Sequence, residues 1–164
     1  MSSRSIRRAA VVACGSATGL VAGTLMGMAA MIHAGSAGLD PFGPVRQVAA
    51  AWYGVAALIG NESIVGVGIL THLAVSMVLG VLFAAVGPRR GGPAVALVSG
   101  LAFATLVWAV FTWVLLPLVD PVMYERVRLF PSAWFLLHLL FGALLTPAPH
   151  LVQLMARTPQ VAPA

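Results

Sequence analysis

Long apolar segments without a charged residue dominate the sequence. The charged residues leave four such runs, at 9–39, 63–88, 91–119 and 129–156. Each run is longer than the roughly 20 residues that a helix needs to cross a bilayer. The pattern therefore predicts a bundle of four transmembrane helices, which we place at about residues 9–32, 63–86, 93–118 and 132–155.

A fifth uncharged run, at 47–61, is too short to span. Its 15 residues would rise only about 1.5 Å each as a helix, against a hydrocarbon core about 30 Å thick. The sequence thus predicts a short interfacial or re-entrant helix at about 47–60. We expect the polar segment 120–130 to be a loop on the same side, and the fourth helix to kink at Pro147.

Composition and charge agree with a membrane protein. Hydrophobic residues make up 60% of the 164 residues and charged residues 8%, compared with roughly 25% charged in soluble domains. The formal net charge is +5, but the nine arginines lie at the ends of the apolar runs and form no continuous patch. Nucleic-acid binding is therefore not expected. The prediction is an all-α integral membrane protein with one transmembrane domain over residues 1–164.

The arginines also predict the orientation of the chain. One side of a four-span bundle carries Arg4, Arg7, Arg8, Arg89, Arg90 and Arg157, and the other carries Arg46, Arg126 and Arg128. Because cytoplasmic loops are enriched in Lys and Arg, both termini should be cytoplasmic. An arginine-only, alanine-rich composition is typical of GC-rich bacterial genomes, so we expect a bacterial inner membrane.

Small residues recur at every fourth position of the expected helices. Because residues four apart share one helix face, they let another backbone approach closely, and close packing joins helices in lipid. We expect these faces to pack within the bundle or between protomers. The residues are Gly15, Gly19, Gly23 and Gly27 in the first helix, Gly68, Ser76 and Gly80 in the second, Gly100 in the third and Gly142 in the fourth.

The two halves of the sequence resemble each other. Gly19, Leu20, Thr24 and Leu25 correspond to Gly100, Leu101, Thr105 and Leu106. Asp40 and Asp120 are each followed by proline, and each half then presents a helix in which small residues follow a histidine after four and eight positions. The pattern indicates a duplicated two-helix unit with the 47–60 helix inserted in the first copy. Chance matching in so Ala-, Leu- and Gly-rich a chain is the alternative.

His72 and His138 are the candidate site residues. They lie about 13 Å and 9 Å along their helices from the expected outer ends, so they could face each other. Ionisable groups inside a membrane are costly and usually face the bundle interior, which makes them functional candidates. Imidazole suits haem iron and copper, and His33 could add a ligand to copper. The alternatives are hydrogen bonds to a hydroxyl or a backbone carbonyl that fix helix register, and a path for protons or solutes.

No sequence motif names a reaction. Nucleophile elbows, HExxH pairs, phosphate-binding glycine loops and paired cysteines do not occur. We therefore expect a non-enzymatic subunit or scaffold that packs through its glycine faces with other membrane proteins or a second copy. The first alternative is a haem- or copper-binding membrane protein that uses the intramembrane histidines. The second is a small proton or solute transporter.

Overall fold

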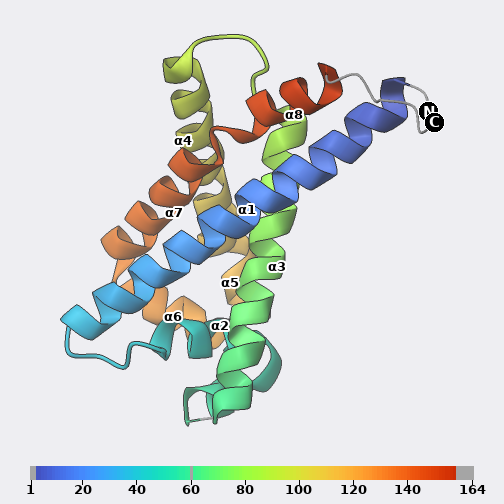
Figure 1. Cartoon of the computed structure of the whole chain (residues 1–164). Helices are drawn as coiled ribbons and strands as arrows, with labels where there is room; N and C mark the ends of the chain where they lie inside the picture. Colours follow the sequence, from blue (N-terminus) through green and yellow to red (C-terminus); the bar gives the residue numbers. More distant parts are fainter. Residues whose placement is uncertain (1–2, 60, 158–164) are drawn as a thin grey trace.

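The computed structural model describes residues 3–59 and 61–157, and they form an all-α bundle (Figure 1). The first two spans are α1 (Ser3–Ser36) and α3 (Glu62–Val86). The third consists of α4 (Pro93–Val110), the π-helical segment η2 (Phe111–Leu115) and α5 (Leu116–Val119), and the fourth of α7 (Pro131–Leu145) and α8 (Ala148–Arg157). These four spans are long and apolar enough to cross a membrane, which confirms the predicted fold class. Gly60, the end of the predicted 47–60 helix, and both chain ends lie outside the described residues.

Local sequence sets where the spans begin and break. The Asn61 side chain accepts a hydrogen bond from the backbone N–H of Ser63 at 3.1 Å and so caps α3. Proline occupies the first turn of both α4 and α7, where its missing N–H costs nothing. The fourth span is interrupted after Leu145 because Pro147 and Pro149 lack the donors that a continuous helix needs.

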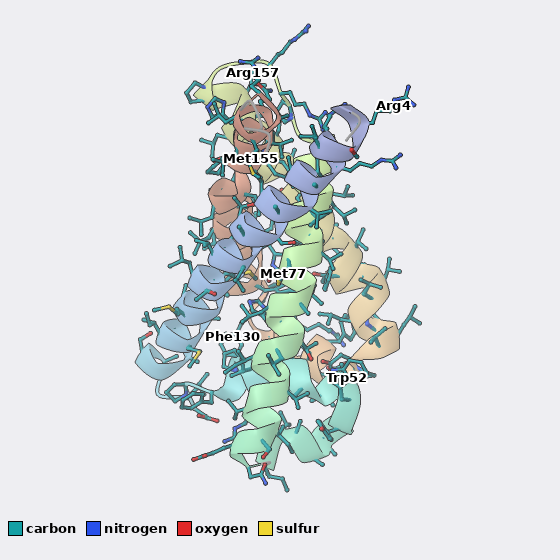
Figure 2. The ribbon with its side chains drawn as sticks, turned by 45° about the vertical axis from the view of Figure 1, so that its right-hand side comes forward. Arg4, Trp52, Met77, Phe130, Met155 and Arg157 are labelled. Atoms are coloured by element: carbon teal, nitrogen blue, oxygen red, sulfur yellow. The ribbon has the colours of Figure 1, made fainter. Side chains whose placement is uncertain are left out.

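The helices pack as two pairs. α1 lies along α3, α4 lies along α7, and α1 joins the pairs by also contacting α7 and α8. Arg4 and Arg157 lie at one end of the bundle, and Trp52 and Phe130 lie toward the other (Figure 2). At the arginine end, Phe83, Leu145 and Val152 are fully buried and fill the space among α1, α3, α7 and α8. This end of the bundle is therefore closely packed.

Two short helices cover the opposite end. α2 (Gly43–Tyr53) continues as the 3₁₀ segment η1 (Gly54–Ile59), so the helix predicted at 47–60 begins earlier and tightens in its second half. α6 (Pro121–Leu129) occupies the segment for which we predicted a loop, and that prediction is wrong. The helix forms because the Asp120 carboxylate accepts a hydrogen bond from the Met123 N–H at 2.9 Å and Pro121 occupies the first turn. α6 contacts α2, and each half of the chain thus has a short outer helix after its Asp-Pro pair.

Candidate functional site

The small residues of α1 and α3 lie at the contact between these helices. A Cβ atom added to Gly19 would overlap the carbonyl oxygen of Ser76, and one added to Gly80 would overlap that of Gly15. The Cβ of Gly23 would lie 2.5 Å from the Ser76 Cβ. Glycine is required at these positions because the two backbones leave no room for a side chain.

The contact between α4 and α7 has the same form. A Cβ atom on Gly100 would overlap the carbonyl oxygen of Gly142, and one on Gly142 would lie 2.5 Å from the Ala104 Cβ. Two further small residues face other partners: Gly27 lies against the His72 ring, and Gly68 lies against the Val45 carbonyl of α2. The predicted packing residues therefore all face neighbours within the chain.

The close contacts fall on positions that the predicted repeat pairs with each other. Gly19 corresponds to Gly100 in the sequence alignment, and Ser76 corresponds to Gly142. Gly19 approaches Ser76 in the first pair, and Gly100 approaches Gly142 in the second. The two helix pairs thus cross at corresponding residues.

The two helix pairs do not contact each other in a symmetric way. α1 packs extensively against α7, whereas α3 makes a smaller contact with α4, at the arginine end of the bundle, where the Phe83 and Phe103 rings lie 5.3 Å apart. Val75 of α3 and Leu115 of η2 border the space between them, and each remains 37% exposed. The bundle is therefore open along one side in its outer half.

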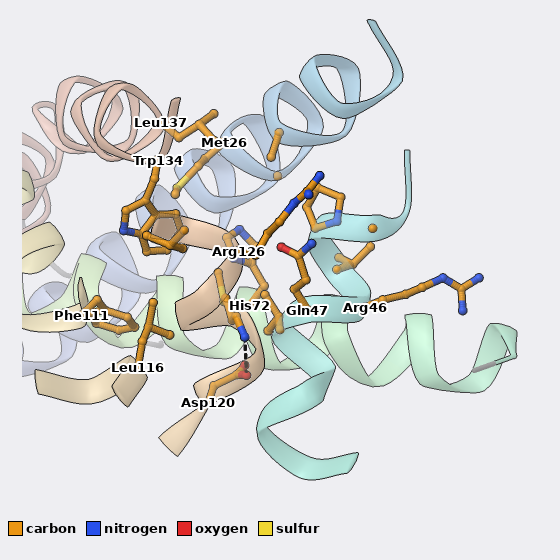
Figure 3. Close-up of a pocket in the computed structure, with 18 of the residues that line it drawn as sticks. Met26, Arg46, Gln47, His72, Phe111, Leu116, Asp120, Arg126, Trp134 and Leu137 are labelled. Carbon is orange, nitrogen blue, oxygen red and sulfur yellow. Dashed lines mark hydrogen bonds between the residues drawn. The ribbon is translucent and has the colours of Figure 1, made fainter. Parts of the chain in front are cut away.

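A cavity of about 640 Å³ occupies this outer half (Figure 3). Residues from α1, α2, α3, the third span, α6 and α7 line it, and most of its wall is apolar, including Met26, Leu116 and Leu137. Its volume is within the range of about 300–1,000 Å³ that is typical of small-molecule sites. His72 and His138 both line the cavity, and His33 lies at its edge on the exposed end of α1.

His138 is held in one orientation. Its ring is 4% exposed, and its Nδ1 lies 2.9 Å from the Trp134 carbonyl oxygen. A carbonyl oxygen can only accept, so Nδ1 carries the proton and Nε2 is left to accept a hydrogen bond or bind a metal. The Trp134 ring packs edge-on at 4.2 Å and donates its own N–H to the Thr112 hydroxyl at 2.8 Å. The carbonyl and the ring of Trp134 thus position the imidazole, and Thr112 holds that ring in place.

His72 makes a bond between helices. Its Nε2 lies 3.0 Å from the Gly23 carbonyl oxygen of α1, so Nε2 donates and fixes the register of α1 against α3. His72 and His138 thus line the same cavity from α3 and α7. Among residues 3–59 and 61–157, no three His, Cys, Asp or Glu side chains are grouped to hold a metal ion.

Charged residues form the outer rim of the cavity. Arg46 pairs with Asp40 at 3.2 Å, whereas the half-buried Arg126 stacks over the Phe130 ring at 4.5 Å and has no ion pair with a described carboxylate. Asp120 is 3% exposed. Burial raises the pKa of Asp120 above its ordinary value of 3.8, and the backbone N–H groups of Met123 and Ala51 partly oppose this rise.

The raised pKa of Asp120 makes stability depend on pH. A carboxyl group whose pKa is higher in the folded than in the unfolded chain favours folding while it is protonated, and this contribution is lost as pH rises through the folded value. Asp120→Asn keeps the capping oxygen but carries no charge. We expect this variant to unfold at a higher temperature than the wild type near pH 7, with the difference shrinking toward pH 3 or so, in thermal scans. A difference that stays constant over this range would contradict the prediction.

Sequence reasoning missed two parts of this site. Arg126 was not predicted to line a site and was expected on a solvated loop, although the Asp120–Pro121 pair is a helix-start signal that would have placed it on a helix. The cavity itself left no sequence signal, because it depends on how far α3 lies from the third span in the outer half of the bundle. No known protein family, curated protein or solved structure matches the chain.

Proposed function

We propose that the chain is a non-enzymatic, multi-pass membrane subunit that holds an amphipathic molecule from the bilayer in the cavity between its helix pairs. The opening between α3 and the third span carries this proposal, because a gap between spans at membrane depth faces lipid. A molecule dissolved in the bilayer could enter there without crossing water. The apolar wall supports an apolar ligand, and the charged rim supports a polar group at one end of it.

We also propose an orientation of the chain in the membrane and an origin of its fold by duplication. Six arginines at one end favour cytoplasmic termini, which would put the cavity in the outer leaflet of a bacterial inner membrane. The corresponding contacts of Gly19 with Ser76 and of Gly100 with Gly142 support a duplicated two-helix unit. Other membrane subunits, or a second copy, would contact the outward sides of the helices, because the small-residue faces are covered inside the chain.

The proposed function predicts that a bound molecule is retained through purification and lost when the side opening is blocked. Val75→Trp adds a large ring at the opening, and we expect it to lower the amount of retained molecule roughly tenfold, about 1.4 kcal/mol of binding free energy. The measurement is mass spectrometry of small molecules extracted from protein purified in a mild detergent.

A matched control separates blocking from a general effect of tryptophan. Leu70 is also on α3 and is 69% exposed, but it does not line the cavity. Leu70→Trp should retain the wild-type amount. Equal amounts in Val75→Trp and wild type, or no retained molecule in the wild type, would reject the proposed function.

Haem binding is a second candidate, and the geometry of His138 favours it. Ligands to metals usually donate their second ring N–H to a carbonyl or carboxylate, and His138 donates Nδ1–H to Trp134 in this way. His72 fits less well as a second axial ligand because its Nε2 is bonded to Gly23. The visible absorption spectrum of the same preparation decides this point, since haem absorbs strongly and a colourless, folded sample would exclude it.

A further inference from the structure

We propose that the molecule held in the cavity is an anionic lipid, with its acidic headgroup against Arg126 and one acyl chain along the apolar wall. This inference rests on the proposed ligand-holding function and specifies the chemistry of the ligand. It follows from the charges at the rim, from the apolar lining and from the side opening.

The rim carries one cation whose charge is not balanced by a described carboxylate. Arg46 is neutralised by Asp40 at 3.2 Å, and Arg128 lies on the exposed face of α6 and pairs with Glu125 at 3.3 Å. Arg126 lines the cavity, and its guanidinium is held over the Phe130 ring at 4.5 Å. A guanidinium offers several N–H donors in a planar arrangement that suits phosphate or carboxylate oxygens.

Asp120 is the other acid on the cavity wall. It would repel an anionic headgroup if it were ionised. Its burial raises its pKa, and its Oδ1 is already occupied by the Met123 N–H. Arg126 is therefore a cation at this rim that a headgroup can reach without displacing an ion pair with a described carboxylate. Figure 3 shows Arg126 and Asp120 among the residues around the pocket.

The shape of the cavity favours a lipid that is only partly enclosed. A volume of about 640 Å³ is typical of a site for a drug-sized molecule, which is smaller than a two-chain lipid. One chain can lie against Phe111, Leu137 and Phe141, while the other passes between Val75 and Leu115 into the bilayer. The side opening thus gives the second chain a place outside the bundle.

The test compares two lipids that differ only in headgroup. The full chain, delipidated in detergent, is incubated with phosphatidylglycerol or phosphatidylcholine carrying the same acyl chains, and bound lipid is counted by native mass spectrometry. We expect wild type to prefer phosphatidylglycerol roughly tenfold. Both lipids offer a phosphate to Arg126, but phosphatidylcholine adds a choline cation that the guanidinium repels. Arg126→Gln should bind the two lipids equally, and Arg126→Lys should keep most of the preference.

Arg128→Gln is the matched control, because it removes a positive charge from the same helix outside the cavity. It should keep the wild-type preference. An unchanged preference in Arg126→Gln, or the same loss in Arg128→Gln, would overturn the headgroup assignment. If wild type binds both lipids equally while another molecule is retained and is lost in Val75→Trp, this inference fails and the proposed function stands. If nothing is retained in the wild type, both fail.

Discussion

Gly19→Leu should destabilise the bundle by about 3 kcal/mol or more, at the upper end of the cost of overpacking a core. The atoms that the new side chain would meet are the Ser76 carbonyl and the Met77 Cα, and neither can turn away as a flexible side chain could. α3 would have to separate from α1 along the most extensive helix contact in the bundle. The measurement is the midpoint of unfolding in mixed detergent–SDS titrations, followed by circular dichroism.

The matched control is Gly66→Leu, in α3. No atom lies within 4 Å of a Cβ placed on Gly66, so the same substitution there meets open space. We expect a change within about 0.5 kcal/mol, as for most surface substitutions. Equal losses in the two variants would show that the effect comes from replacing a helical glycine in general and not from the contact between α1 and α3.

The four spans could be predicted from the sequence because the bilayer imposes a strong rule. A backbone inside lipid must satisfy its own hydrogen bonds, so an uncharged apolar run of sufficient length becomes a helix. The sequence predicted the ends of these helices less accurately. α1 begins at Ser3, ahead of the predicted start at residue 9, because a helix that leaves the hydrocarbon core need not end there.

Hydropathy alone did not predict the helix α6 or the π-helical turn. The segment 120–130 carries Glu125, Arg126 and Arg128, and this polarity resembled a loop. Asp120 caps the segment and α2 packs against it, so local and tertiary contacts make it helical. The π-helical turn at 111–115 was equally hidden, because a wider hydrogen-bonding register leaves no hydrophobic period to detect.

The candidate site was predictable in position but not in partners. Depth along the helices placed His72 and His138 in the same half of the bundle, and the structure puts both on one cavity. The bond of His72 to the Gly23 carbonyl depends on how α1 crosses α3, and the bond of His138 to the Trp134 carbonyl depends on the side-chain rotamer of His138. A sequence pattern specifies neither the crossing nor the rotamer. It also cannot show that α1 packs more extensively on α7 than α3 packs on the third span.

That asymmetry connects packing to the proposed binding. If both pairs had closed against each other on both sides, α3 and α4 would fill the space that the ligand needs. The first helix pair is held by the close approach of Gly19 to Ser76 and the second by that of Gly100 to Gly142. The cavity lies where these pairs diverge, and the third span lines one side of it through Val107 of α4 and through η2 and α5.

Gly100→Leu should displace α4 from α7 and so move the side of the cavity that the third span lines. Its Cβ would overlap the Gly142 carbonyl and lie 3.0 Å from the Thr146 methyl, so α4 must move away from α7. We expect a loss of about 2 kcal/mol, smaller than for Gly19→Leu, because α4 packs mainly on α7 whereas α1 contacts α3, α7 and α8. Since this side of the cavity moves, the retained molecule should be lost as well.

Hydrogen exchange measured by mass spectrometry distinguishes displacement of α4 from loss of the whole fold. In Gly100→Leu, exchange should rise in α4 and stay near the wild-type level in α1 and α3, because the contacts of that pair are untouched. Ala102→Leu is the control, since Ala102 is exposed on the same helix and should leave exchange and ligand retention unchanged. A uniform rise over all four spans would mean that the bundle unfolds as one unit. The two pairs would then not be separate structural units, and the cavity could not depend on the position of α4 alone.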